Sequence, residues 1–144
     1  MADANEHCIF CVIAEADPHG QTFYEDEHVV AFLDIAPAAE GHALVVPRRH
    51  AADVLSITSD DFAAVARGAH AVAALLNEEM RPDGLTIVQS NGTAAGQDVL
   101  HLHVHVIPRF ASDALVPPWN SSPAGAVQGV AQLTDALRRR VAAQ

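Results

Sequence analysis

The sequence predicts an α+β fold with a mostly antiparallel sheet, one long helix, and short helices near the N- and C-termini. Apolar residues recur at helical spacing between residues 58 and 80, whereas several shorter segments rich in β-branched residues end at turn residues. The 144 residues carry no internal repeat and no low-complexity linker. We therefore expect a single domain over residues 1–144.

Short elements are predicted before residue 50, each bounded by turn-forming residues. They are, in order, a helix at 8–16, a turn at 17–20, strands at 22–25 and 29–33 joined by a hairpin turn at 26–28, a loop at 37–41, and a strand at 42–46. Pro47 is expected to stop the last strand because proline has no N–H to donate to a sheet.

The long helix is predicted to begin at Thr58 or Ser59 and to end at Met80. Asp60 and Asp61 suit its first turn because carboxylates are stabilised at a helix N-terminus. One face carries the apolar residues Phe62, Val65, Ala69, Val72 and Leu76. Residues 81–84 read Arg-Pro-Asp-Gly and end the helix.

The remaining elements are predicted to be two strands and a helical tail. They are a strand at 85–89, a loop at 91–97, a strand with three histidines at 101–109, an irregular segment around Pro117-Pro118-Trp119, and a helix at about 124–142. Arg138, Arg139 and Arg140 would lie in the last turn of that helix, where cations are favourable.

The acidic composition limits the classes of partner. A formal net charge of −10 argues against non-specific nucleic-acid binding, which needs a basic face. A phosphorylated small molecule is still compatible, since one pocket can be electropositive, and Arg48, Arg49 and Arg109 lie near candidate site residues in sequence. No apolar run is long enough to span a membrane, and residues 1–7 do not resemble a signal peptide. We expect a cytoplasmic protein.

Three histidines, His101, His103 and His105, alternate with apolar residues. A β-strand would place the three imidazoles on one face, about 6.6 Å apart. Leu102, Val104, Val106 and Ile107 would serve the core, with Ile107 ending the strict alternation. Three interpretations are open: metal ligation, nucleophilic attack on phosphorus, or surface histidines without a role.

Two further patterns bear on this choice. Cys8 and Cys11 are spaced as Cys-x-x-Cys, which suits half of a tetrahedral zinc site or a redox pair, although such cysteines are often core residues. Asn91, Gly96 and Gln97 supply amide groups and a flexible backbone just before the histidines. An anion or leaving-group pocket requires such groups, but many Gly-rich loops are only turns.

Residues 96–106, Gly-Gln-Asp-Val-Leu-His-Leu-His-Val-His-Val, resemble the signature of the histidine triad (HIT) family of nucleotide hydrolases and transferases. Upstream segments match the family pattern in order, at 10–11, 24–26, 31–35, 41–42 and 45–50. The resemblance covers about residues 8–109, leaves the tail 110–144 divergent, and is greatest to small bacterial Hint-type proteins.

The resemblance implies a HIT-like homodimer that binds a purine nucleotide. It implies that His103 attacks the α-phosphate to form a nucleotidyl-histidine, and that water then releases the nucleoside monophosphate. His105 would donate a hydrogen bond to the phosphate, and His42 would support the site from behind.

The resemblance also assigns nucleotide-binding residues. Asp34 matches the residue that holds the ribose hydroxyls, as suits a carboxylate acceptor, and Ile35 would lie beside the base. An alternative role for Asp34 is to cap the following turn. Residues near the phosphate and leaving group would be Asn91, Gly96, Gln97, Asp98, His103 and His105.

In zinc-bearing members the two cysteines join two histidines, which correspond here to His50 and His101. A site of Cys8, Cys11, His50 and His101 would be a closed structural zinc site. His101 and His103 would then have different roles. The alternative for His50 is a plain surface histidine.

One position departs from the family pattern, and another lies in the tail that diverges from it. Asp98 stands where the family usually carries Ser or Thr, and its carboxylate would repel phosphate and accept rather than donate a hydrogen bond. Trp119 lies in the divergent tail, where it either corresponds to an aromatic near the partner subunit or anchors an interface or core without contacting substrate.

The prediction is a hydrolase of purine nucleoside phosphoramidates or related nucleoside 5′-phosphate derivatives. The first alternative is a dinucleoside polyphosphate hydrolase or phosphorylase of the same family. A second is a nucleotide-binding interaction module that Asp98 has made catalytically weak, and a third is a plain zinc-dependent hydrolase.

Overall fold

The computed structural model describes residues 7–18, 20, 22–115 and 129–144. The chain forms two compact units, residues 1–113 and 114–144, and each is described by itself. The predicted single domain over residues 1–144 stays a prediction. Trp119 and residues 124–128 of the predicted C-terminal helix lie outside the described residues.

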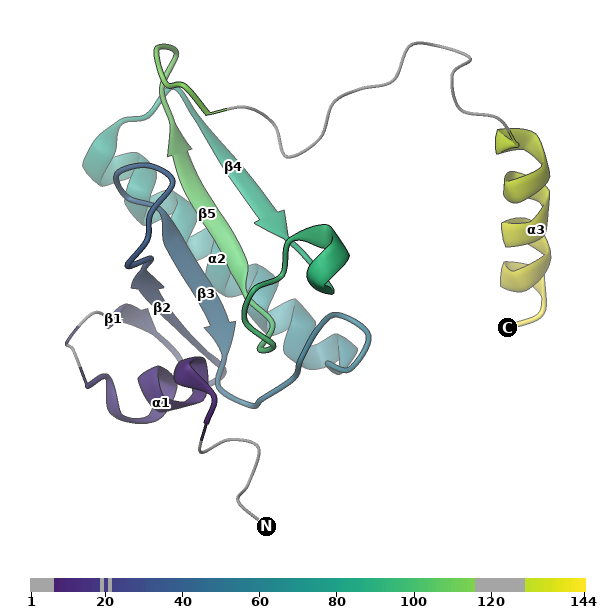
Figure 1. The fold of residues 1–144 in the computed structure, drawn as a ribbon, viewed down its shortest axis with the longest axis horizontal. Helices are drawn as coiled ribbons and strands as arrows, with labels where there is room; N and C mark the ends of the chain where they lie inside the picture. The colour runs from purple at the N-terminus through teal and green to yellow at the C-terminus, as the bar shows by residue number, and fades with distance from the viewer. Residues whose placement is uncertain (1–6, 19, 21, 116–128) are drawn as a thin grey trace. The chain divides into compact units, whose positions relative to one another are not determined.

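The first unit is built around one five-stranded antiparallel sheet with strand order β1-β2-β3-β5-β4 (Figure 1). The strands are β1 (Thr22–Glu25), β2 (Val29–Leu33), β3 (Ala43–Pro47), β4 (Gly84–Gln89) and β5 (Val104–Arg109). The predicted α+β class and antiparallel sheet are confirmed. β4 lies at one edge of the sheet, next to the histidine-bearing strand.

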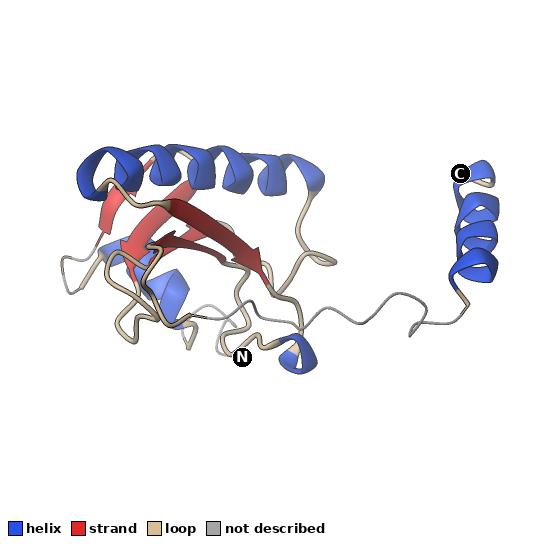
Figure 2. Ribbon diagram, turned by 90° about the horizontal axis from the view of Figure 1, so that it is seen from above, coloured by secondary structure: helices blue, strands red, loops and turns tan. Residues whose placement is uncertain are grey.

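Helices cover both faces of the sheet, the long α2 (Ser59–Met80) on one and the short α1 (Ile9–Ala16) on the other (Figure 2). Alternate residues of β2 and β3 point to opposite faces, as the two-residue period of a strand requires. The core under α2 includes Val29, Ala31, Val45, Leu102 and Val106. The core under α1 includes Phe10, Ile13, Val30, Phe32, Leu44 and Val46.

Helix α2 follows its predicted pattern closely. Thr58 Oγ1 accepts a hydrogen bond from the Asp61 N–H at 3.1 Å, and Arg81 ends the helix in a left-handed conformation. Four of the five predicted apolar residues, Val65, Ala69, Val72 and Leu76, are buried, while the fifth, Phe62, is half-buried against the same core. Gly68 lies so close to β2 that an added Cβ would come within 2.7 Å of Val29 Cγ2.

Several predicted strand boundaries are wrong, including the start of β4, which is at Gly84 rather than at residue 85. β3 starts at Ala43 and includes Pro47, because a proline at the last position of a strand forfeits only one donor. β5 starts at Val104 rather than at residue 101. The backbone groups just before Val104 make their hydrogen bonds outside the sheet. The Leu102 N–H donates to the Ala51 carbonyl, and the His101 carbonyl accepts from the His103 side chain.

The alternation in β5 also continues further than predicted. Val104, Val106 and Pro108 are buried, whereas His105, Ile107 and Arg109 are half-buried. Ile107 was expected to serve the core, and this expectation is wrong because its side chain lies on the face opposite Val106.

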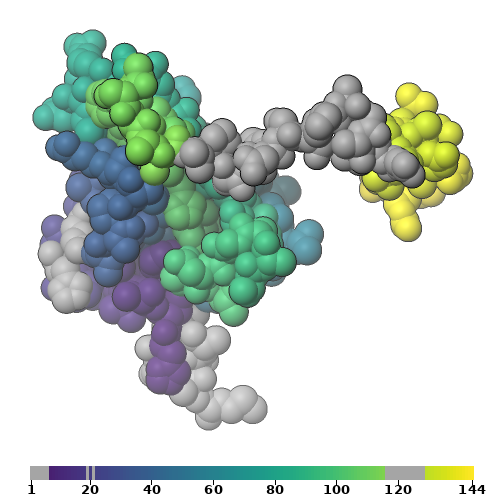
Figure 3. Space-filling model, turned by 45° about the horizontal axis from the view of Figure 1, so that its top comes forward, coloured from purple at the N-terminus to yellow at the C-terminus, as the bar shows by residue number. Residues whose placement is uncertain are grey.

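The second unit contains α3 (Val130–Ala142), with Arg139 and Arg140 in its last turn. In the parts of the chain that are described, no helix has the combination of length and apolarity that crossing a membrane demands. In the first unit, α1 and the loop after β4 lie on one face, which carries the candidate site (Figure 3).

Candidate functional site

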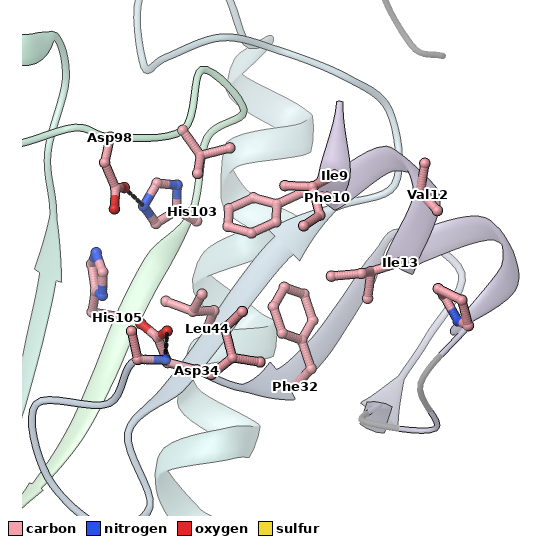
Figure 4. Close-up of a pocket in the computed structure, with 14 residues that line it drawn as sticks. Ile9, Phe10, Val12, Ile13, Phe32, Asp34, Leu44, Asp98, His103 and His105 are labelled. Carbon is pink, nitrogen blue, oxygen red and sulfur yellow. Dashed lines mark hydrogen bonds and ion pairs between the residues drawn. The ribbon is translucent and has the colours of Figure 1, made fainter. Parts of the chain in front are cut away.

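A cavity of about 400 Å³ opens on the α1 face of the sheet (Figure 4). This volume is in the range of small-molecule sites. Most of its wall is apolar and comes from α1, β2 and β3, with polar groups at one end. The lining residues are Ile9, Phe10, Val12, Ile13, Pro18, Phe32, Asp34, Ile35, Ala36, Leu44, Asp98, Val99, His103 and His105.

The His103 side chain is 5% exposed, and its hydrogen-bonding fixes the tautomer of its ring. Nδ1 lies 2.7 Å from the His101 carbonyl oxygen. Because a carbonyl can only accept, Nδ1 must carry the hydrogen, and Nε2 of the neutral ring keeps its lone pair. Phe10 holds the ring edge-on with centroids 5.2 Å apart. In its neutral form His103 therefore presents an unprotonated nitrogen at the cavity, as a nucleophile requires.

His42 and His105 form a second chain of fixed tautomers. The Ala38 N–H donates to His42 Nδ1 at 2.9 Å, so the hydrogen of the neutral His42 ring is on Nε2. His42 Nε2 in turn donates to His105 Nδ1 at 2.8 Å. His105 is then left with its hydrogen on Nε2, as a hydrogen-bond donor.

Burial keeps both of these rings neutral at neutral pH. It lowers the pKa of His42, an effect that the carboxylate of Asp34 partly opposes. Burial lowers the pKa of His105 to about 4, and the neighbouring His103 and His42 act in the same direction. The His105 ring is thus a neutral donor, in keeping with the tautomer that His42 imposes.

Asp34 uses its two oxygens differently. Oδ1 accepts from the Ala36 N–H at 2.9 Å, so the alternative role as a turn cap is present. Oδ2 lies 3.7 Å from His42 Nε2, and the side chain is 20% exposed at the cavity wall. Asp34, His42 and His105 are close enough together to suggest a metal. However, His42 Nε2 carries a hydrogen that His105 Nδ1 accepts, so neither nitrogen is free to ligate one.

Four side chains form a second cluster behind the cavity: Cys8, Cys11, His50 and His101. His101 Nδ1 lies 3.4 Å from Cys8 Sγ, 3.5 Å from Cys11 Sγ and 3.2 Å from His50 Nδ1. Cys11 Sγ is 3.4 Å from His50 Nδ1. Tetrahedral zinc bonds would place two nitrogens about 3.3 Å apart and a nitrogen and a sulfur about 3.6 Å apart. The four side chains therefore fit a zinc ion.

The protonation of this cluster also suits a metal. His101 Nε2 lies 2.8 Å from the Pro47 carbonyl oxygen and must donate to it, which leaves Nδ1 as the ligating atom. Burial raises the pKa of the Cys11 thiol to about 12, with a contribution from Cys8, and lowers the pKa of His101 to about 4. A divalent cation would compensate for the burial of thiolates.

The cluster connects α1 to the histidine segment. Cys8 and Cys11 belong to the start of α1, His50 follows β3, and His101 precedes β5. Phe10 lies between the two cysteines in sequence, and its ring contacts both His101 and His103. The cluster thus holds the helix whose side chains form the cavity wall.

The predicted loop amides do not line the cavity. Asn91 Oδ1 accepts from the Val54 N–H at 2.7 Å, and its amide exchanges hydrogen bonds with Gln89. Gln97 is buried, where its oxygen accepts from the Gly92 N–H and its nitrogen donates to two carbonyls. Gly96 is in a left-handed conformation that ends the short turn. These residues hold the loop that carries Asp98.

The arginines that lie near the site in sequence are elsewhere in space. Arg48 pairs with Glu25, Arg49 with Asp61, and Arg109 with Asp113. None of the described residues that line the cavity is an arginine. A phosphate would therefore meet imidazoles rather than fixed positive charge.

Sequence reasoning did not identify the apolar wall. Ile9, Phe10, Val12, Ile13, Phe32 and Leu44 read as core residues by their spacing. The available signal was α1 itself, which is apolar on more than one side: Ile9 is 53% exposed and Val12 is 40% exposed. Nor could the sequence identify the backbone groups of Ala38, Pro47 and His101 that fix the imidazole tautomers.

Comparison with known proteins gives consistent matches. A sequence model described as the HIT domain matches residues 16–112. The protein called Protein hit of Bacillus subtilis is 41% identical over 117 residues, which are 81% of each chain. An adenosine 5′-monophosphoramidase of Saccharomyces cerevisiae is 38% identical over 113 residues, which are 78% of this chain and 69% of the yeast protein.

Solved structures match over nearly the full chain. The crystal structure of a member of the HIT family of proteins from Bacillus subtilis has a TM-score of 0.83 at 33% identity, covering 93% of this chain and 96% of that one. A Zn-bound histidine triad family protein from Mycobacterium smegmatis has a TM-score of 0.73 at 32% identity, with coverages of 97% and 99%.

Proposed function

The chain belongs to the HIT family, and from this we propose that it is a nucleotide-binding hydrolase of purine nucleoside phosphoramidates or related nucleoside 5′-phosphate derivatives. The observation that carries the proposal is the bond from His103 Nδ1 to the His101 carbonyl, which leaves Nε2 unprotonated at the cavity. The yeast relative, an adenosine 5′-monophosphoramidase, supports the reaction class.

In the proposed reaction, His103 Nε2 attacks the α-phosphorus. The Nε2–P bond forms as the P–N bond breaks, and the departing nitrogen takes the electron pair and a proton from solvent. Water then attacks phosphorus, the Nε2–P bond breaks, and the nucleoside monophosphate leaves. Nδ1 stays protonated throughout, so the His101 carbonyl stabilises the positive ring of the intermediate. His105 Nε2–H donates to a phosphoryl oxygen, and His42 maintains that donor.

The nucleoside is proposed to bind along the apolar wall. Phe10, Phe32 and Leu44 offer a surface for a purine ring, and the exposed Ile35 would cover its outer side. Asp34 Oδ2 makes only a 3.7 Å contact with His42, so it is available to accept from ribose hydroxyls. Asn91, Gly96 and Gln97 would act indirectly by supporting the loop before the histidines.

The Cys8, Cys11, His50 and His101 cluster is proposed to hold a structural zinc ion. The near-tetrahedral distances and the Zn-bound relative from Mycobacterium smegmatis support this assignment. A closed site with four protein ligands offers no position for substrate. Its role would be to fix α1 and the segment before β5.

A homodimer is also proposed. The support in this chain is the edge strand β4, on which Leu85 is 36% exposed and Ile87 is 54% exposed. Unpaired edge strands with apolar residues favour association with another chain.

The experiment compares His103→Ala with His70→Ala, which changes an exposed histidine on α2. Turnover of an adenosine 5′-phosphoramidate should fall at least about a thousandfold in His103→Ala because the nucleophile is lost, while His70→Ala keeps the wild-type rate. Calorimetry should still detect AMP binding by His103→Ala. A His103→Ala protein that keeps most of its hydrolytic rate would contradict the mechanism.

A parallel assay with diadenosine tetraphosphate separates the rival enzyme class. Faster turnover of this compound than of the phosphoramidate would favour a dinucleoside polyphosphate hydrolase. AMP binding without turnover of either compound would favour an interaction module.

A further inference from the structure

Asp98 lies at the mouth of the cavity beside the proposed nucleophile. Its Oδ1 is 3.8 Å from His103 Nε2, and its side chain is 84% exposed. Figure 4 shows Asp98 on one side of His103 and the apolar residues Ile13 and Phe32 on the other. A nucleoside bound along the apolar wall would therefore leave the Asp98 side of the reacting phosphorus to the leaving group.

The reach of Asp98 extends to the leaving group itself. A nucleophile and its target atom are about 3 to 3.5 Å apart before reaction, and the leaving group begins one bond beyond. A carboxylate 3.8 Å from Nε2 therefore lies at a distance from the nucleophile similar to that of the reacting phosphorus. Because Asp98 is exposed, a leaving group can reach it without entering the protein interior.

The acidic side chains in the described cavity lining have no basic arginine beside them. The cavity lining contains two carboxylates, Asp34 and Asp98, and no arginine among the described residues. The chain has no lysine at all. An anionic leaving group would meet repulsion from Asp98 with no arginine in the described cavity lining to offset it, whereas a cationic group would be attracted.

We propose that Asp98 selects substrates by leaving-group charge, favouring nucleoside 5′-phosphoramidates whose leaving amine carries an additional positive charge. This inference rests on the proposed function. Asp98 takes no part in the covalent steps: the P–N bond still breaks with its electron pair going to nitrogen, which takes a proton from solvent. The carboxylate pairs with the cationic substituent of the amine before and during that step. The same charge disfavours oligophosphate leaving groups.

The size of the effect follows from the exposure of Asp98. A single charge at an exposed site changes kcat/KM about fivefold for each unit of leaving-group charge. The preference should shrink as salt is raised, because the screening length falls from about 10 Å at 0.1 M to about 3 Å at 1 M.

The test uses three adenosine 5′-phosphoramidates of similar size. Their leaving amines are ethylenediamine, propylamine and glycine, which carry a cationic, neutral and anionic substituent. At low ionic strength the wild-type kcat/KM should be about 25-fold higher for the cationic than for the anionic compound, as two fivefold steps. Asp98→Asn keeps the shape of the side chain and should bring this ratio close to one.

The matched control is Glu27→Gln, which removes one negative charge from a side chain that is 88% exposed and outside the cavity lining. It should keep the wild-type ratio. A wild-type ratio near one, or an equal ratio in wild type and Asp98→Asn, would overturn the inference while turnover of all three compounds upheld the proposed function. Absence of wild-type turnover of every compound would overturn both.

Discussion

Replacing His105 with Gln should remove a large part of the acid sensitivity of folding. Burial lowers the pKa of His105 to about 4 in the folded protein, whereas an unfolded histidine has a pKa of about 6.5. His103 and His42 lower this pKa further, and Asp34 and Asp98 act in the opposite direction. Between these two pKa values the unfolded chain binds a proton that the folded chain does not. The free energy of unfolding must therefore fall as pH falls below about 6.5.

The magnitude follows from the two pKa values. Each pKa unit corresponds to about 1.4 kcal/mol, and at pH 4.5 the unfolded ring is almost fully protonated while the folded ring is mostly neutral. Linkage then gives a loss of about 2 to 2.5 kcal/mol between pH 7.5 and pH 4.5 from this one residue. A loss of this size is a substantial share of the stability of a small protein.

The assay is urea unfolding of wild type, His105→Gln and His70→Gln at both pH values. The Cys/His cluster is the same in all three proteins, so any contribution from it cancels in the comparison. His105→Gln should lose about 2 kcal/mol less than wild type between pH 7.5 and pH 4.5, while His70→Gln, changed at an exposed position, loses as much as wild type. Equal losses in His105→Gln and wild type would refute the reasoning.

Three further changes test other parts of the structure. Cys11→Ser should abolish the expected one zinc ion per subunit in elemental analysis of untagged protein, and equal zinc in both proteins would rule out the four-ligand site. Ile87→Asp should shift the protein towards monomer in light scattering because it puts a charge on the apolar edge strand, and an unchanged dimer would place the interface elsewhere. Gly68→Ala should lower the free energy of unfolding, measured in urea, by about 1 kcal/mol. The cost of overpacking against Val29, about 1 to 3 kcal/mol, exceeds the helix-propensity gain of about 1 kcal/mol. A more stable variant would show that the strand moves to make room for the added methyl group.

The periodic parts of the fold could be predicted from the sequence. The bounds of β1 and β2, the extent of α2 and its buried face follow from alternation, helical spacing and turn residues. The strand ends at Pro47 and Val104 could not be predicted in this way. Both depend on which carbonyls are taken by loops and side chains, and such bonds join residues far apart in sequence.

The sequence by itself determined the residue types of the site and, through the resemblance, the family. It identified Cys8, Cys11, His50 and His101 as one set and His42, His103 and His105 as another, and the structure brings the members of each set together. It also singled out Asp98 as the unusual position. The histidine alternation and the Cys-x-x-Cys pair are read from the residues alone, whereas the grouping into sets and the departure at Asp98 follow from the resemblance.

Only the tertiary structure decided what each imidazole can do. Backbone groups of Ala38, Pro47 and His101 fix which nitrogen of His42, His101 and His103 carries hydrogen. The fold also removed Asn91 and Gln97 from the cavity by giving their amides internal partners, and built the apolar wall from α1. The physical reason is that a neutral imidazole has one donor and one acceptor nitrogen, and only the partners present in three dimensions select between them.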